Sequence, residues 1–165
     1  MLKIEYKFIQ SEKGLTPKSK NDILHREAYL LLDKMLHDIE IFEYEIKKTS
    51  LGKPYIEGFP VHFSISHTDG LVCCIISDKE CGIDCEKIEI KENVQRISER
   101  YFVGDEITKM KESDFSFEEF LRIWTCKEAI GKRLGCGVMK AMKIDSTKEN
   151  CSTIIENGYI ISVNI

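Results

Sequence analysis

The sequence has 165 residues, 42% of them hydrophobic and 32% charged, which suits one compact domain or two tightly fused halves and argues against disorder. Its 24 lysines and arginines against 28 acidic residues give a formal net charge of −4. A general nucleic-acid-binding protein needs a basic surface and is therefore not expected. Charge-free stretches reach about ten residues, short of the roughly 20 of a membrane helix. The N-terminal residues lack a signal-peptide pattern, so the expected location is cytoplasmic.

The seven cysteines are an odd number, and their spacing matches neither a disulfide framework nor a zinc site. On one extended strand, Cys81 and Cys85 would lie about 13 Å apart, too far for a disulfide. Free thiols in a reducing compartment are expected. A catalytic cysteine is not favoured, because none has an obvious activating neighbour in the sequence.

The first half of the chain predicts the order β-α-β-β-β. Apolar and charged residues alternate over 2–8, as in a strand with one wet face. After Thr16 and Pro17, apolar residues recur at helical spacing from Leu24 to Leu36. Alternation over 42–46 predicts a strand, and a hairpin is expected from 63–65 and 71–76, joined at 68–70.

The second half predicts a strand at 81–86, polar helices near 91–112, a long helix and a final hairpin. Ser116 and Glu119 form a capping box ahead of an apolar helix that should run to about Leu134 and stop at Gly135. Asn157-Gly158 predicts a type I′ hairpin turn. The fold class is therefore α+β, with two side-by-side subdomains at 1–78 and 79–165, each a small, mainly antiparallel sheet with helices packed on it.

Two carboxylates are forced together at 84 and 86. Residues two apart on a strand share a face, so Asp84 and Glu86 would repel by roughly 4 kcal/mol at 4 Å in an effective dielectric of 20. Either one carboxylate takes up a proton, or the pair binds a cation that prefers oxygen ligands, such as magnesium, calcium or manganese. The alternative is that both simply meet solvent.

Glu128 lies in the middle of a helix that is apolar on nearly all sides, so its carboxylate needs a partner. Lys132 follows four residues later, and a simple helical ion pair would explain both. If this helix packs against the Asp84 strand, three carboxylates and one ammonium converge, which suits a magnesium ion carrying a diphosphate.

Two weaker signals lie upstream. The segment 64–68 ends a strand at a turn and offers hydroxyls, His67 and backbone amides that could hold a phosphate, although a histidine at a turn is often only solvent-exposed. The motif Gly52-Lys53-Pro54 by itself is a common turn sequence. Neither motif decides the function alone.

In order and spacing, these motifs together resemble the 4′-phosphopantetheinyl transferase superfamily over roughly residues 25–137. The matching segments are Gly52-Lys53-Pro54, 63–68, 82–86, Tyr101-Phe102 with Glu106, and 124–129 with Lys132 and Gly135. The resemblance implies transfer of the 4′-phosphopantetheine arm of coenzyme A to a serine of an apo carrier protein, with release of adenosine 3′,5′-bisphosphate. It also implies a pseudo-twofold pair of α/β halves, with coenzyme A bound in the cleft between them.

The resemblance further assigns roles to individual residues. Asp84 and Glu128 correspond to magnesium ligands, with Glu86 as a third or water-mediated ligand, and manganese is an alternative ion. Lys132 would hold the diphosphate, and Glu128 would take the proton of the attacking serine. The adenosine 3′-phosphate would be bound by Ser66, His67, Lys53 and Arg26. Glu106 matches a family position to which no role is assigned.

Length and partners complete the expectations. The chain is longer than the small trimeric carrier-protein synthases and shorter than typical pseudo-dimeric members, and a pseudo-dimer is expected to be monomeric. The carrier could serve fatty acid, polyketide or nonribosomal peptide biosynthesis. A basic patch at the end of the Glu128 helix would attract an acidic carrier; its residues are Lys127, Lys132, Arg133, Lys140 and Lys143. Alternative functions are a non-catalytic coenzyme A-binding protein and a magnesium-dependent phosphohydrolase.

Overall fold

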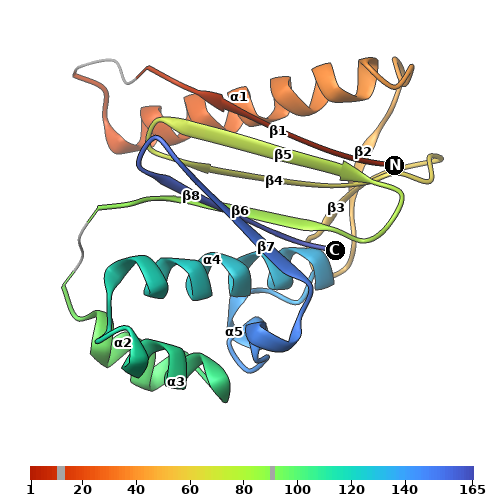
Figure 1. Ribbon diagram of the computed structural model, residues 1–165. Coiled ribbons are helices and arrows are strands. Elements are labelled where there is room, and N and C mark those ends of the chain that lie inside the picture. The colour runs from red at the N-terminus through yellow and green to blue at the C-terminus, as the bar shows by residue number, and fades with distance from the viewer. Residues whose placement is uncertain (11–13, 90–91) are drawn as a thin grey trace.

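The computed structural model describes residues 1–10, 14–89 and 92–165. Two antiparallel three-stranded sheets lie between helices, with α1 on one side and α4 on the other (Figure 1). The predicted α+β class with small antiparallel sheets is confirmed. No helix in the described ranges is long and apolar enough to cross a membrane.

The first sheet has the order β1-β5-β4, from Leu2–Phe8, Leu71–Ser77 and His62–Thr68. Helix α1, Pro17–His37, packs on it, and Thr16 caps this helix by accepting a hydrogen bond from the Ser19 amide at 3.1 Å. A separate two-stranded ladder joins β2, Ile46–Lys48, to β3, Pro54–Ile56. The predicted strand at 42–46 was wrong at its start, because Phe42 and Tyr44 lie outside β2.

The second sheet has the order β6-β8-β7, from Gly82–Lys87, Tyr159–Asn164 and Cys151–Glu156. Helix α4, Phe117–Leu134, packs on this sheet, begins at a Ser116 cap and ends at Gly135 with a positive φ of 61°. Helices α2, Val94–Tyr101, and α3, Asp105–Glu112, lie beyond α4 (Figure 1). The short α5, Val138–Ala141, and a 3-10 turn at Ser146–Lys148 lead into β7.

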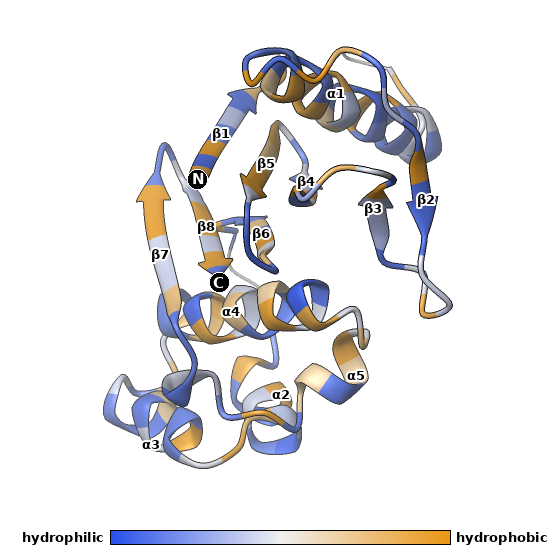
Figure 2. Cartoon of the chain, turned by 90° about the vertical axis from the view of Figure 1, so that its right-hand side faces the viewer, coloured by the Kyte–Doolittle hydropathy of each residue, from blue (hydrophilic) through white to orange (hydrophobic). Residues whose placement is uncertain are grey.

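Strand β5 is apolar from Leu71 to Ile76, and both of its faces are covered. Val72, Cys74 and Ile76 face the core beneath α1. Leu71, Cys73 and Ile75 face a second core shared with β6 and β8. Figure 2 shows β5 as continuously hydrophobic. This explains why its sequence lacks the alternation that marks the half-exposed β1.

The terminal hairpin forms as predicted. Asn157 and Gly158 have φ values of 50° and 80°, the two positive angles that a type I′ turn requires. All seven cysteines lie in the described ranges and are free thiols, also as predicted. The proposed division at residues 78 and 79 stays a prediction.

Candidate active site

The candidate site lies where β4 of the first sheet meets β6 of the second. Serine hydroxyls on β4 join these strands: Ser64 Oγ accepts a hydrogen bond from the Ile83 amide at 3.1 Å. Two residues on, Ser66 Oγ donates to Asp84 Oδ1 at 2.8 Å. The alternation of small hydroxyl residues on one face of β4 therefore brings Asp84, which is only 7% exposed, to a fixed position at the junction.

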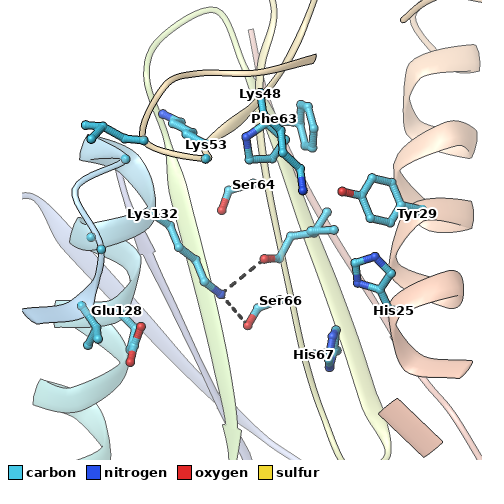
Figure 3. Close-up of a pocket in the computed structure, with 18 residues that line it drawn as sticks. His25, Tyr29, Lys48, Lys53, Phe63, Ser64, Ser66, His67, Glu128 and Lys132 are labelled. Atoms are coloured by element: carbon cyan, nitrogen blue, oxygen red, sulfur yellow. Dashed lines mark hydrogen bonds between the residues drawn. The ribbon is translucent and has the colours of Figure 1, made fainter. Parts of the chain in front are cut away.

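Lys132 of α4 completes this junction. Its ammonium donates to Asp84 Oδ1 at 2.8 Å. It also donates to Ser66 Oγ at 2.7 Å and to the Ile65 carbonyl at 3.3 Å (Figure 3). Burial opposes the charged form of Lys132, but the charge and hydrogen bond of Asp84 outweigh it and raise the Lys132 pKa. The lysine is therefore held as a cation, and its side chain is still 31% exposed.

Glu128 lies one helical turn before Lys132, on the wall of the same cavity (Figure 3). Burial, followed by the negative charges of Asp84 and Glu86, raises the pKa of Glu128, and Lys132 counteracts this only in part. Its carboxylate has no hydrogen-bonding partner within 1–10, 14–89 and 92–165. Glu128 is thus an available proton acceptor or ligand, not half of the simple helical pair with Lys132.

Glu86 lies further along β6, and Thr68 Oγ1 donates to its Oε2 at 3.5 Å. Among the described residues, no three His, Cys, Asp or Glu side chains are placed as a ready metal-binding group. Magnesium needs fewer protein ligands than that, since it is usually bound by one or two carboxylates together with waters and substrate phosphates. Asp84 and Glu128 act on each other electrostatically and offer only oxygen donors, so the site fits magnesium completed by phosphate oxygens.

A cavity of about 510 Å³ opens between α1 and α4 over this junction, within the size range of small-molecule sites. Four of the predicted site residues for coenzyme A line it, together with Glu128. They are Lys53, Ser66, His67 and Lys132. Asp84 and Glu86 do not contribute to its wall. Asp84 is contacted by Lys132 and Ser66, which do line the cavity.

Helix α1 supplies two polar aromatic side chains that were not among the predicted site residues. His25 and Tyr29 line the cavity, one turn apart (Figure 3). The ring centroid of His25 lies 6.1 Å from that of His67. Burial, then the charges of His25 and Lys132, lower the pKa of His67. Polar aromatic residues at i and i+4 of an otherwise apolar helix face were the signal that could have identified them.

Two lysines near the β2–β3 ladder have different environments. The Lys53 ammonium binds Glu80 and the Arg133 carbonyl, the latter at 2.5 Å, and points away from the cavity centre in Figure 3. Lys48 is exposed, lines the cavity and points its ammonium into it between Ser64 and Tyr29. Lys48 has no ion pair with any described carboxylate.

Arg26 lies away from this group. Its side chain is 68% exposed, pairs with Glu27 at 3.5 Å and borders a different cavity, next to Lys20 and Asp69. Arg26 points about 100° around α1 from His25, and it does not line the cavity that His25 borders.

Lys127 of α4 and Glu106 of α3 form a second ion pair, and both side chains are 0% exposed. The Lys127 ammonium contacts both Glu106 oxygens, at 2.6 and 2.7 Å, and the Ile144 carbonyl at 2.7 Å. Glu106 also accepts hydrogen bonds from the Val103 and Ser146 amides. The pair therefore fastens α3, α4 and the segment before β7 to one another.

This pair corrects the predicted basic patch. Lys127 is buried and cannot contribute to a surface. The prediction included it because sequence position alone does not show which face of a helix is covered. Arg133 binds Glu149 at 2.9 Å and Asn164, so its charge is neutralised locally. Only Lys140 and Lys143 of the predicted patch are well exposed.

Comparison with known proteins gives the same family as the site motifs. Residues 80–160 match the model of the 4′-phosphopantetheinyl transferase superfamily. A 4′-phosphopantetheinyl transferase of Aneurinibacillus migulanus is 36% identical over 94 residues, which is 56% of this chain and 38% of that protein. One from Bacillus subtilis is 35% identical over 98 residues, which is 58% and 42% of the two chains. A third, from Salmonella typhi, is 33% identical over 100 residues, 58% and 52%.

The chain spans about half or less of the length of these curated relatives. The shared region includes β6, α4 and the carboxylate and lysine residues that they carry. The chain belongs to the 4′-phosphopantetheinyl transferase superfamily.

Proposed function

We propose that the protein transfers the 4′-phosphopantetheine group of coenzyme A to a serine of an apo carrier protein. The observation that carries this proposal is the junction of Asp84, Glu128 and Lys132 at a cavity, within a region matched by the transferase family. A fixed ammonium next to two carboxylates suits a substrate that brings a diphosphate and a metal ion together.

The diphosphate of coenzyme A would meet Lys132 first. Its ammonium exchanges the hydrogen bonds to Asp84 and Ser66 for phosphate oxygens, which frees Asp84 as a ligand. Asp84 and Glu128 would hold magnesium, with Glu86 as the third or water-mediated ligand. The ion, when bound, neutralises the charge of the diphosphate.

Glu128 would accept the proton. The carrier serine oxygen forms a bond to the phosphorus of the phosphopantetheine group, and the bond from that phosphorus to the bridging oxygen breaks. Adenosine 3′,5′-bisphosphate leaves with the bridging oxygen, and the serine proton passes to Glu128. Its raised pKa favours this role, because a base with a pKa closer to the operating pH binds the proton more firmly.

The adenosine 3′-phosphate would bind at the α1 side of the cavity. Ser66, His67 and Lys53 are the residues expected from the sequence, and Lys48 and His25 join them because they line the same wall. Lys48 is the better cation of the two lysines, since the Lys53 charge is already satisfied by Glu80. Arg26 would contribute only through long-range charge.

The partner would be an acidic carrier protein of fatty acid, polyketide or nonribosomal peptide synthesis, bound by a monomeric transferase. Lys140 and Lys143 remain exposed beside the cavity wall formed by Gly137 and Val138, and they are the proposed contacts for its acidic surface.

The test is incubation with coenzyme A, magnesium and an apo carrier protein, followed by mass spectrometry of the carrier. We expect addition of the phosphopantetheine mass, which is lost with excess chelator and with Asp84→Asn. Full turnover in chelator would contradict the metal assignment. Release of adenosine 3′,5′-bisphosphate without carrier would indicate a phosphohydrolase, and binding of coenzyme A without either product would indicate a binding protein.

A further inference from the structure

Two cysteines outside the proposed transfer chemistry lie against each other on α4 and β7. Cys151 and Thr153 are two apart on β7 and so share the face that packs on α4. From α4, Cys126 Sγ contacts the Thr153 hydroxyl at 3.6 Å. Cys151 precedes Thr153 by two residues on this strand face, which places its thiol next to that of Cys126. Both residues are half-buried, so small reagents can reach this dithiol.

A second thiol pair offers an internal comparison. Cys73 and Cys85 lie on β5 and β6, which contact each other, and the Cys85 thiol acts electrostatically on that of Cys73. However, these residues are 0% and 2% exposed and belong to the core between the two sheets. The two pairs therefore have the same chemistry and differ in access.

We propose that Cys126 and Cys151 form a reversible disulfide on exposure to a peroxide, and that Cys73 and Cys85 do not. One thiol sulfur is oxidised by the peroxide to a sulfenic acid, with release of one water. The second thiol attacks that sulfur, the S–S bond forms, and the sulfenic oxygen leaves as a second water. Two thiols and one hydrogen peroxide thus give one disulfide and two waters, and a dithiol reductant reverses the change.

The geometry favours this step because Cys126 Sγ already lies 3.6 Å from the Thr153 hydroxyl, on the strand face that Cys151 shares. The cross-link would join the middle of α4, next to Lys127 and Glu128, to the first residue of β7. Such a link restricts the unfolded chain, so the oxidised protein should melt at a higher temperature than the reduced one. The inference does not depend on the transfer activity.

The experiment treats the folded wild-type protein with a small excess of hydrogen peroxide, blocks remaining thiols by alkylation, and maps peptides by mass. We expect loss of two hydrogens, one linked peptide pair joining Cys126 to Cys151, and a melting temperature that rises by several degrees and returns on reduction. Cys73 and Cys85 should be alkylated only after denaturation.

Cys151→Ser should abolish the cross-link, whereas Cys136→Ser, at another half-buried thiol, should leave it intact. Added oxygen on Cys126 or Cys151 without a link, or a disulfide that includes Cys73, Cys85 or Cys136, would overturn the proposal. Because the wild-type map decides between these results, the inference is tested even if a variant fails to fold.

Discussion

Helix α4 carries the lysines of two lysine–carboxylate pairs that lie in opposite environments. Lys127 and Glu106 are sealed from solvent, and every oxygen of the carboxylate is hydrogen-bonded. Lys132 and Asp84 share a similar distance, yet Lys132 is partly exposed at a cavity. A sealed and saturated pair can only hold the fold together, whereas a partly exposed pair can exchange its partner for a ligand.

The largest effect should follow from breaking the sealed pair. Lys127→Met leaves Glu106 buried without its counter-charge, and this should lower the free energy of unfolding by about 3–5 kcal/mol. Chemical denaturation measures the change. The double variant with Glu106→Gln should recover part of the loss, because the uncompensated charge is removed. A Lys127→Met protein as stable as the wild type would show that the pair is not structural.

Breaking the Lys132–Asp84 pair at the cavity should reduce activity more than stability. Lys132→Ala should lower the rate of transfer by roughly a hundredfold or more, because an ammonium aimed at the diphosphate is lost. Its stability should fall by less than that of Lys127→Met, since water can reach Asp84 from the cavity. Arg122→Ala, an exposed α4 cation paired with Glu118, is the control and should change neither quantity. Loss of stability without loss of rate would reverse the roles assigned to the two pairs.

Lys47 and Lys48, adjacent on β2, allow a similar comparison at the other end of the cavity, between a lysine with an ion pair and one that has none among the described residues. Lys48→Ala should raise KM for coenzyme A by roughly tenfold to a hundredfold, since a charge-assisted hydrogen bond is worth roughly 1.5–3 kcal/mol. It should also reduce discrimination against the 3′-dephospho form. Lys47→Ala is the matched control, because Lys47 binds Glu57 and does not line the cavity. Equal KM values for the two variants would remove Lys48 from the phosphate site.

The smallest expected effect is on stability, from Asp145, which lies next to the segment that contacts Lys127 and Glu106. Asp145 accepts hydrogen bonds from the Asp105 and Thr147 amides and from the Thr147 hydroxyl. Burial opposes its ionisation, but these hydrogen bonds lower the Asp145 pKa from 3.8 to about 2. The depressed pKa stabilises the fold above pH 3.8, and this contribution disappears as the pH falls through about 2. Asp145→Asn should therefore be less stable than wild type at pH 7, and the difference should shrink between pH 4 and 2. A pH-independent difference would contradict the ionised role.

Much of the fold could be predicted because local rules and packing agree. The structure confirms the local signals in the sequence. These are the start of α1 at Thr16-Pro17, the Ser116 cap and Gly135 end of α4, and the turn at Asn157-Gly158. The strand expected at Phe42 and Tyr44 failed because alternation cannot show whether a neighbouring strand is present to pair with.

The site was predictable where its residues belong to compact motifs, and less so elsewhere. Periodicity placed Asp84 on a strand face and Glu128 and Lys132 on one helix face, and α4 does pack so that Lys132 meets Asp84, while the roles of the three residues stay predictions. His25, Tyr29 and Lys48 were missed because their place on the cavity depends on how α1 and β2 lie against β4. The roles of Lys127 and Glu106 depend on burial, which charge patterns do not show.

A crystal structure of the protein with coenzyme A, magnesium and a catalytically impaired Glu128→Gln chain would test the account most directly. We expect the diphosphate on Lys132, with its hydrogen bond to Asp84 exchanged for phosphate oxygens, the metal ion on Asp84, and the 3′-phosphate near Lys48 and His67. Lys127 and Glu106 should keep their contacts unchanged. Coenzyme A bound instead in the cavity beside Lys20 and Arg26, with Lys132 still on Asp84, would contradict the account.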